Sequence, residues 1–199
     1  ARAQGAAGVV MDVRTGELLA LTSYPEYSSS ALAGGDSAAI NAYNADKHLP
    51  FLNRATDGLY APGSIVKPLM AAAALAEGVI DEHKQLLSTG QLVVPNPYDP
   101  EKPTIFKDWR VNGWTDARRA IAVSSDIYFY EVGGGFESQP GLPAQAGLGI
   151  ARIDQYLRLF GFGADAGLAG YSEGDGTIPT PEWKAANFPQ DPLWRIGDT

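Results

Sequence analysis

The chain has 199 residues, enough for one domain with its own hydrophobic core, and no stretch approaches the ~20 consecutive apolar residues that span a bilayer. It has no cysteine, which excludes disulfides, thiol nucleophiles and thiolate zinc sites, and His48 and His83 stand far apart outside any ligand pattern, so no metal is expected. The formal net charge is −8 and no run of Lys and Arg is present, which argues against nucleic acid as a partner.

The first predicted element is a β-hairpin at residues 8–23. Two β-rich stretches flank a tight turn that contains Gly16. Residues 24–45 are rich in Ser, Ala, Gly and Asn and show no clear periodicity. They predict an irregular surface connection that contributes few core residues.

A helix is predicted over residues 62–79. Pro62 and Gly63 supply a start signal, an alanine-rich run follows, and Gly78 closes the segment. Its many small side chains indicate close packing on both sides, as in a buried central helix. Residues 91–108 carry several prolines and predict a loop or a pair of short extended pieces.

Two more helices are predicted in the second half of the chain. Thr115 is a plausible N-cap for a helix that reaches a polar break at residues 124–126. The strongly apolar run 127–132 follows and ends at three glycines. Apolar residues then recur three and four positions apart over residues 150–160, which predicts an amphipathic helix ended by Gly161.

Ser64 and Lys67 form the first candidate for chemistry. Three residues apart on the first turn of a helix, they would lie on one face with Cβ atoms about 5–6 Å apart. A serine hydroxyl becomes a good nucleophile when a neighbouring base takes its proton, and free N–H groups at a helix start can stabilise an oxyanion. This spacing also arises by chance, and the alternative is a capping serine with a lysine that reaches solvent.

The polar break supplies the second candidate. Ser124 and Asp126 follow a helix and precede an aromatic run, where they could point into a cleft as a relay hydroxyl and a polar anchor. Taken alone, the same residues are equally typical of a helix cap or a turn.

The order of these motifs resembles the transpeptidase domain of class B penicillin-binding proteins, of the elongation type. That superfamily carries a Ser-x-x-Lys, a Ser-x-Asn and a Lys-Thr-Gly motif. The blocks that are similar lie at residues 8–20, 53–56, 60–68, 124–130, 159–163 and 178–184, and residues 197–199 look like the approach to a Gly-Gln-Gly block.

The resemblance implies an α/β (α+β) fold of the penicillin-binding and serine β-lactamase type. Residues 1–199 are then a partial transpeptidase domain, with a hairpin and connection in residues 1–60 and the active-site helix and helical lobe in residues 61–199. The Lys-Thr-Gly motif is absent, because the one lysine after Ser124 is Lys184, which is followed by alanines. We therefore expect an incomplete sheet and a chain that is inactive by itself.

The resemblance also implies a reaction: peptidoglycan D,D-transpeptidation through a serine acyl-enzyme, without metal or organic cofactor. Ser64 would be the nucleophile and Lys67 its general base. Ser124 would relay a proton to the leaving amine, and Asp126 would orient Lys67 or the substrate amide. A β-lactamase or β-lactam sensor of the same superfamily, and a non-catalytic scaffold fragment, remain alternatives.

The partners implied are peptidoglycan stem peptides, β-lactam antibiotics, a membrane-embedded glycan polymerase and other cell-wall machinery. The location implied is the bacterial cell envelope, on the extracytoplasmic side of the inner membrane, with an anchor in a segment absent from this chain.

Overall fold

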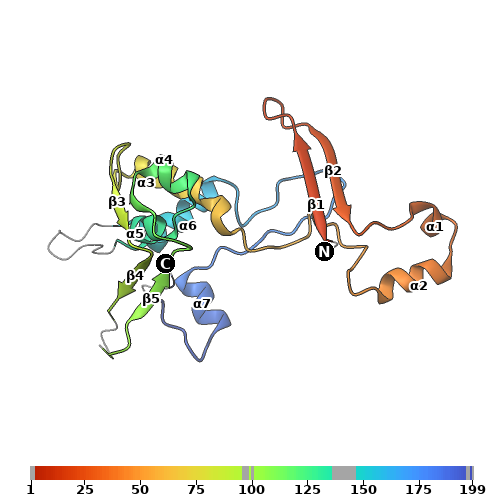
Figure 1. Cartoon of the computed structure of the whole chain (residues 1–199). Coiled ribbons are helices and arrows are strands. Elements are labelled where there is room, and N and C mark those ends of the chain that lie inside the picture. The colour runs from red at the N-terminus through yellow and green to blue at the C-terminus, as the bar shows by residue number, and fades with distance from the viewer. Residues whose placement is uncertain (1–2, 96–98, 100, 136–146, 196–197, 199) are drawn as a thin grey trace. The chain divides into compact units, whose positions relative to one another are not determined.

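A computed structural model describes residues 3–95, 99, 101–135, 147–195 and 198 of the chain (Figure 1). These residues divide into two units. Unit 1 comprises residues 1–61 and 164–176, and unit 2 comprises residues 62–163 and 177–199. Of the block expected at residues 197–199, only Asp198 lies within the described residues.

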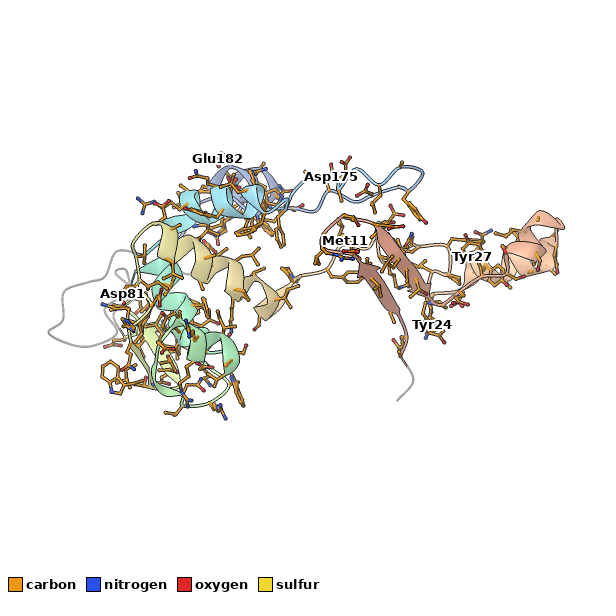
Figure 2. All side chains as sticks on the ribbon, turned by 90° about the horizontal axis from the view of Figure 1, so that it is seen from above. Met11, Tyr24, Tyr27, Asp81, Asp175 and Glu182 are labelled. Atoms are coloured by element: carbon orange, nitrogen blue, oxygen red, sulfur yellow. The ribbon has the colours of Figure 1, made fainter. Side chains whose placement is uncertain are left out.

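Unit 1 begins with the predicted hairpin, which is confirmed. Strands β1 (Ala6–Met11) and β2 (Leu18–Tyr24) pair antiparallel, with an irregularity in register between Val10 and Met11. Gly16 ends the turn with φ +77°, a conformation that glycine adopts without steric cost. Most side chains of both strands are exposed, and Met11 projects from the hairpin in Figure 2.

Two short helices follow, where an irregular connection was expected, and that expectation is wrong. Helix α1 (Ser29–Ala33) is capped by the Ser28 hydroxyl, and helix α2 (Ser37–Ala45) by the Asp36 carboxylate, which accepts from two backbone N–H groups. Neither helix has a buried residue. Since no apolar face is needed, the sequence shows no helical period, and the expected scarcity of core residues is confirmed.

In unit 2, a 3-10 turn η1 (Gly63–Val66) leads directly into helix α3 (Lys67–Ala76), within the range predicted for one helix. Ala73 and Ala74 on α3 are fully buried, whereas Ala72 and Leu75 are exposed, so the helix packs along one side rather than all round. Gly78 follows with φ +67°, consistent with its expected role at the helix end.

Four short strands accompany α3. Strand β3 (Leu86–Ser88) pairs antiparallel with β6 (Gly113–Thr115), and β4 (Gln91–Val94) with β5 (Thr104–Lys107). Of the two alternatives predicted for residues 91–108, a loop or a pair of short extended pieces, the β4–β5 pair confirms the second. Helices and short antiparallel strands together agree with the predicted α+β class.

Helix α4 (Ala117–Ala122) is capped by Asp116, not by Thr115 as expected. The Asp116 carboxylate accepts from the Arg119 N–H, whereas Thr115 belongs to β6 and its buried hydroxyl donates to the Leu86 carbonyl. A carboxylate one residue further on reaches the free N–H groups, because strand pairing holds Thr115 in the sheet.

The apolar run after the polar break forms helix α5 (Asp126–Gly134), and the predicted amphipathic helix is confirmed as α6 (Gly149–Leu159). Helix α7 (Pro181–Asn187) begins after the Thr180 cap. No helix among the described residues is long and apolar enough to cross a membrane.

The main core of unit 2 lies where α3, α4, α5 and α6 meet (Figure 1). Small side chains let these helices approach closely around one buried tyrosine. The buried members of this core are Ala73, Ala74, Ile80, Leu86, Ala117, Ala120, Tyr128, Val132 and Leu148.

Replacing Tyr128 with phenylalanine is expected to leave the free energy of unfolding unchanged or raise it by up to about 1 kcal/mol. The Tyr128 hydroxyl is buried without a hydrogen-bond partner among the described residues, and burial raises its pKa to about 12. Chemical denaturation measures the effect. Tyr156→Phe is the matched control, because it removes a hydrogen bond to Glu77 at 2.9 Å and should lower stability. A clear loss of stability in Tyr128→Phe would show that its hydroxyl is satisfied.

Candidate active site

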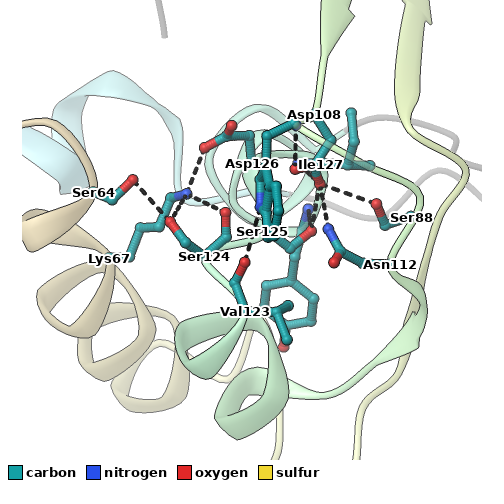
Figure 3. Close-up of polar contacts among 12 residues, drawn as sticks. Ser64, Lys67, Ser88, Asp108, Asn112, Val123, Ser124, Ser125, Asp126 and Ile127 are labelled. Carbon is teal, nitrogen blue, oxygen red and sulfur yellow. Dashed lines mark hydrogen bonds and ion pairs between the residues drawn. The ribbon is translucent and has the colours of Figure 1, made fainter.

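The structure brings the four predicted site residues together in unit 2 (Figure 3). Ser64 lies on η1 and Lys67 begins α3, while Ser124 occupies the turn between α4 and α5, and Asp126 begins α5. Residues about sixty positions apart in the chain thus face one another across hydrogen-bond distances.

A chain of hydrogen bonds connects these residues. Ser124 Oγ donates to Ser64 Oγ at 3.0 Å, and Lys67 Nζ donates to Ser124 Oγ at 3.1 Å. In the described residues, the hydrogen-bonded route from Ser64 to Lys67 therefore passes through Ser124. The Ser124 hydroxyl thus contacts both Ser64 and Lys67.

Lys67 is the centre of the cluster. Its side chain is only 9% exposed, and its ammonium also donates to the Ser124 carbonyl at 2.9 Å and to Asp126 Oδ1 at 2.5 Å. An ammonium has three N–H donors, and each has an acceptor here. The alternative in which Lys67 reaches solvent is therefore wrong, and so is the capping role for Ser64, since η1 has no side-chain cap.

Local backbone geometry explains how Ser64 and Lys67 are placed relative to each other. The tight 3-10 turn places Ser64 one turn ahead of Lys67, and the Lys67 N–H donates to the Ser64 carbonyl. Ser64 is exposed at the surface while Lys67 is buried. A hydroxyl that solvent can reach thus lies one turn ahead of an amine that is buried.

Ser124 has an unusual backbone conformation, with φ +54°. It ends α4 as glycine commonly does, with its N–H donating to Ile121 O and the next N–H, of Ser125, donating to Ala120 O. A side chain in this left-handed region costs about 1–2 kcal/mol. Despite this cost, the residue here is a serine, and its hydroxyl lies between Ser64 and Lys67.

Ser125 and Asp108 were not singled out from the sequence. The Ser125 hydroxyl caps α5 and donates to Asp108 Oδ2 at 2.8 Å, so the cap expected somewhere in residues 124–126 is this residue. Burial alone would raise the pKa of Asp108, but hydrogen bonds from Ser125, Ile127 and Ser88 outweigh it and lower the pKa. Asp108 follows a proline-rich stretch, 17 residues before Ser125, and no local pattern connects them.

No group of three or more potential metal ligands occurs among the described residues. His48 instead shares a hydrogen bond with Asp46 inside a local turn of unit 1.

Comparison with known proteins agrees with this geometry. A family model of the penicillin binding protein transpeptidase domain matches residues 6–191. The chain is 35% identical over 197 residues to the peptidoglycan D,D-transpeptidase MrdA of Escherichia coli strain K12, which covers 98% of this chain and 28% of that protein.

Similar solved structures include two of PBP2. Penicillin-binding protein PBP2 of Helicobacter pylori, in its complex with MreC, has a TM-score of 0.81 at 31% identity, over 96% of this chain and 32% of that one. PBP2 of Pseudomonas aeruginosa, in complex with WCK 5153, has a TM-score of 0.75 at 30% identity, over 96% of this chain and 40% of that one. The chain thus spans less than half the length of each of these relatives.

Replacing Ser124 with glycine is expected to give a protein about 1 kcal/mol more stable than the Ser124→Ala variant, because alanine keeps the strain of a positive φ and glycine does not. Both variants lose the hydroxyl, so their difference isolates the backbone. Denaturant titration of the two variants measures it. Equal stability, or a more stable alanine variant, would mean that Ser124 is not held in the left-handed region.

The lowered pKa of Asp108 predicts a contribution to stability against acid. The ionised carboxylate is favoured in the folded state, so its contribution is present above the ordinary aspartate pKa of 3.8 and is lost as the pH falls through the lower folded value. Asp108→Asn should therefore lose stability at neutral pH and show a shallower decline in acid. Unfolding curves from pH 7 downwards test this, and parallel curves for both proteins would contradict it.

Proposed function

The chain belongs to the penicillin-binding protein transpeptidase family, and we propose that it forms part of a peptidoglycan D,D-transpeptidase in which Ser64 is acylated. The elongation-type class B subfamily is supported by the identity to MrdA and by the PBP2 structures. The observation that carries the proposal is the hydrogen-bonded series Ser64, Ser124, Lys67 and Asp126.

In the proposed acylation, Ser64 Oγ attacks the carbonyl carbon between the two residues of a D-Ala-D-Ala stem-peptide end. Its proton passes to Ser124 Oγ, whose own proton passes to Lys67, after the Lys67 ammonium has released one proton to solvent and become the neutral base. Hydroxyl hydrogens rotate, so the same heavy-atom positions serve transfer in either direction. Two bonds at about 3 Å make this relay short.

Collapse of the tetrahedral intermediate breaks the peptide bond. The leaving D-Ala amine takes a proton from Ser124, which is replenished by the Lys67 ammonium. The amine of a neighbouring stem peptide then attacks the Ser64 ester, gives up a proton along the same route, and releases Ser64 as a free hydroxyl. A β-lactam would acylate Ser64 by the same steps, with the ring amide in place of the peptide bond.

Asp126 has a supporting role in this scheme. Its carboxylate is about one-third exposed and is paired with Lys67 at 2.5 Å. It therefore holds the Lys67 amine next to Ser124, whichever way the proton travels. Substrate contacts at the exposed edge of Asp126 are compatible with this position.

We propose stem peptides and β-lactams as the ligands, and the extracytoplasmic side of the bacterial inner membrane as the location, with an anchor in a segment outside this chain. The solved complex of H. pylori PBP2 with MreC supports cell-wall machinery as partners, and a membrane-embedded glycan polymerase would supply the strands to be linked. We propose no metal or organic cofactor for the reaction, because serine, lysine and a second serine supply its nucleophile and proton carriers.

Incubation of the full-length protein with a fluorescent penicillin, followed by mass mapping, is expected to place the label on Ser64. Ser64→Ala should abolish labelling, whereas Ser172→Ala, a change at an exposed serine of unit 1, should leave it intact. A label that persists for many minutes favours a transpeptidase, and a label lost within seconds favours a β-lactamase. Absence of any label on the folded protein would overturn the proposal in favour of a scaffold.

A further inference from the structure

Ser125 separates the two proposed site residues of the α4–α5 turn and points to their opposite side. Ser124 and Asp126 contact Lys67, while the fully buried Ser125 hydroxyl donates to Asp108 Oδ2 at 2.8 Å (Figure 3). Successive residues of the turn thus have different partners, Lys67 for Ser124 and Asp126, and Asp108 for Ser125.

Asp108 holds this turn by more than one bond. The same oxygen, Oδ2, accepts from the Ile127 N–H at 3.3 Å. The Ile127 side chain packs into a small buried cluster with Leu92 and Val94 of β4. The beginning of α5 is thus held in two ways: the Ile127 backbone N–H donates to Asp108, and the Ile127 side chain packs against β4.

The residue after Asp108 contacts Val123, which immediately precedes Ser124. Trp109 Nε1 donates to the Val123 carbonyl at 2.9 Å, and the Trp109 backbone N–H donates to Asp108 Oδ1 at 2.8 Å. Together these two residues, here named the 108–109 clamp, hold the positions immediately before and after Ser124. The strained residue lies between two anchored neighbours.

Further hydrogen bonds hold the 108–109 clamp in place within unit 2. The Asp108 N–H donates to the Gly90 carbonyl at 3.0 Å, and Oδ2 accepts from Ser88 Oγ and Asn112 Nδ2, each at 3.0 Å. Accepting from several donors favours the ionised carboxylate, since protonation would turn one of its acceptor sites into a donor. Its charge thereby strengthens each of the bonds to the turn.

We propose that Asp108 is a positioning residue: through the 108–109 clamp it keeps Ser124 in its left-handed conformation and within hydrogen-bond distance of Ser64 and Lys67. This rests on the function proposed for Ser64. Asp108 touches none of the reacting atoms, and acts by fixing residues 123–127. A shift of about 1 Å in a relay group is enough to slow a reaction roughly a hundredfold.

The test compares Asp108→Asn with Ser88→Ala in the full-length protein. Both substitutions weaken the hydrogen bond between residues 88 and 108, but only Asp108→Asn also weakens the bonds that Ser125 and Ile127 donate to residue 108. Asp108→Asn should reduce the maximal rate constant of penicillin acylation roughly tenfold to hundredfold, with little change in the half-saturating concentration. Ser88→Ala should stay within about twofold of the wild type in acylation, even where its melting temperature falls.

A double-variant cycle adds a second readout. If Asp108 acts through Ser125, then Asp108→Asn combined with Ser125→Ala should acylate no more slowly than the slower single variant. Trp109→Phe removes the indole N–H while keeping an aromatic ring, and should produce a smaller loss. Acylation losses that simply follow melting temperature, with Ser88→Ala as slow as Asp108→Asn, would show that Asp108 serves the fold alone and would overturn the proposal.

Hydrogen exchange measured on the same proteins does not depend on acylation. Asp108→Asn should increase the exchange rate of the amides of residues 124–127, and Ser88→Ala should leave them protected. If the wild type is not labelled at Ser64, the proposed function fails, while the exchange rates still decide whether Asp108 positions the turn. Unchanged protection in Asp108→Asn would refute the clamp.

Discussion

Burial of the Lys67 ammonium is the constraint on which the site in unit 2 depends. A charged amine removed from water must be fully hydrogen bonded, and each of its three donors finds an oxygen of Ser124 or Asp126. One of these acceptors is the Ser124 carbonyl, which is why the backbone of the turn matters as much as its side chains. The left-handed Ser124 and the cap at Ser125 both serve this requirement.

Close packing of helices makes that arrangement possible. Ala73 and Ala74 on α3, and Ala120 on α4, are fully buried, so the backbones of neighbouring helices come near enough for a lysine on α3 to reach the α4–α5 turn. Larger side chains at these positions would separate the elements. The runs of alanine thus serve the placement of one amine as well as the formation of a helix.

Rigidity and strain are combined at the same turn. Ser124 carries an unfavourable backbone conformation, and strain of this kind persists only where the surroundings over-determine it. Here α4 ends in two backbone hydrogen bonds, α5 begins with a capped turn, and Asp108 and Trp109 contact the residues on either side. The Ser124 hydroxyl is therefore held between Ser64 and Lys67, where the proposed proton relay requires it.

Local signals in the sequence determined the hairpin with Gly16, the amphipathic helix at residues 150–160, and the placement of Ser64 one turn ahead of Lys67, because each depends on geometry within a few residues. The order of the motifs indicated the family, and with it Ser124 and Asp126. Only the tertiary structure decided that Ser125 faces away from Lys67 and that Asp108 holds it, since these contacts join residues 17 or more apart and depend on how helices and strands pack. The helices of residues 24–45 were missed for the converse reason: they bury nothing, so end caps rather than an apolar period specify them.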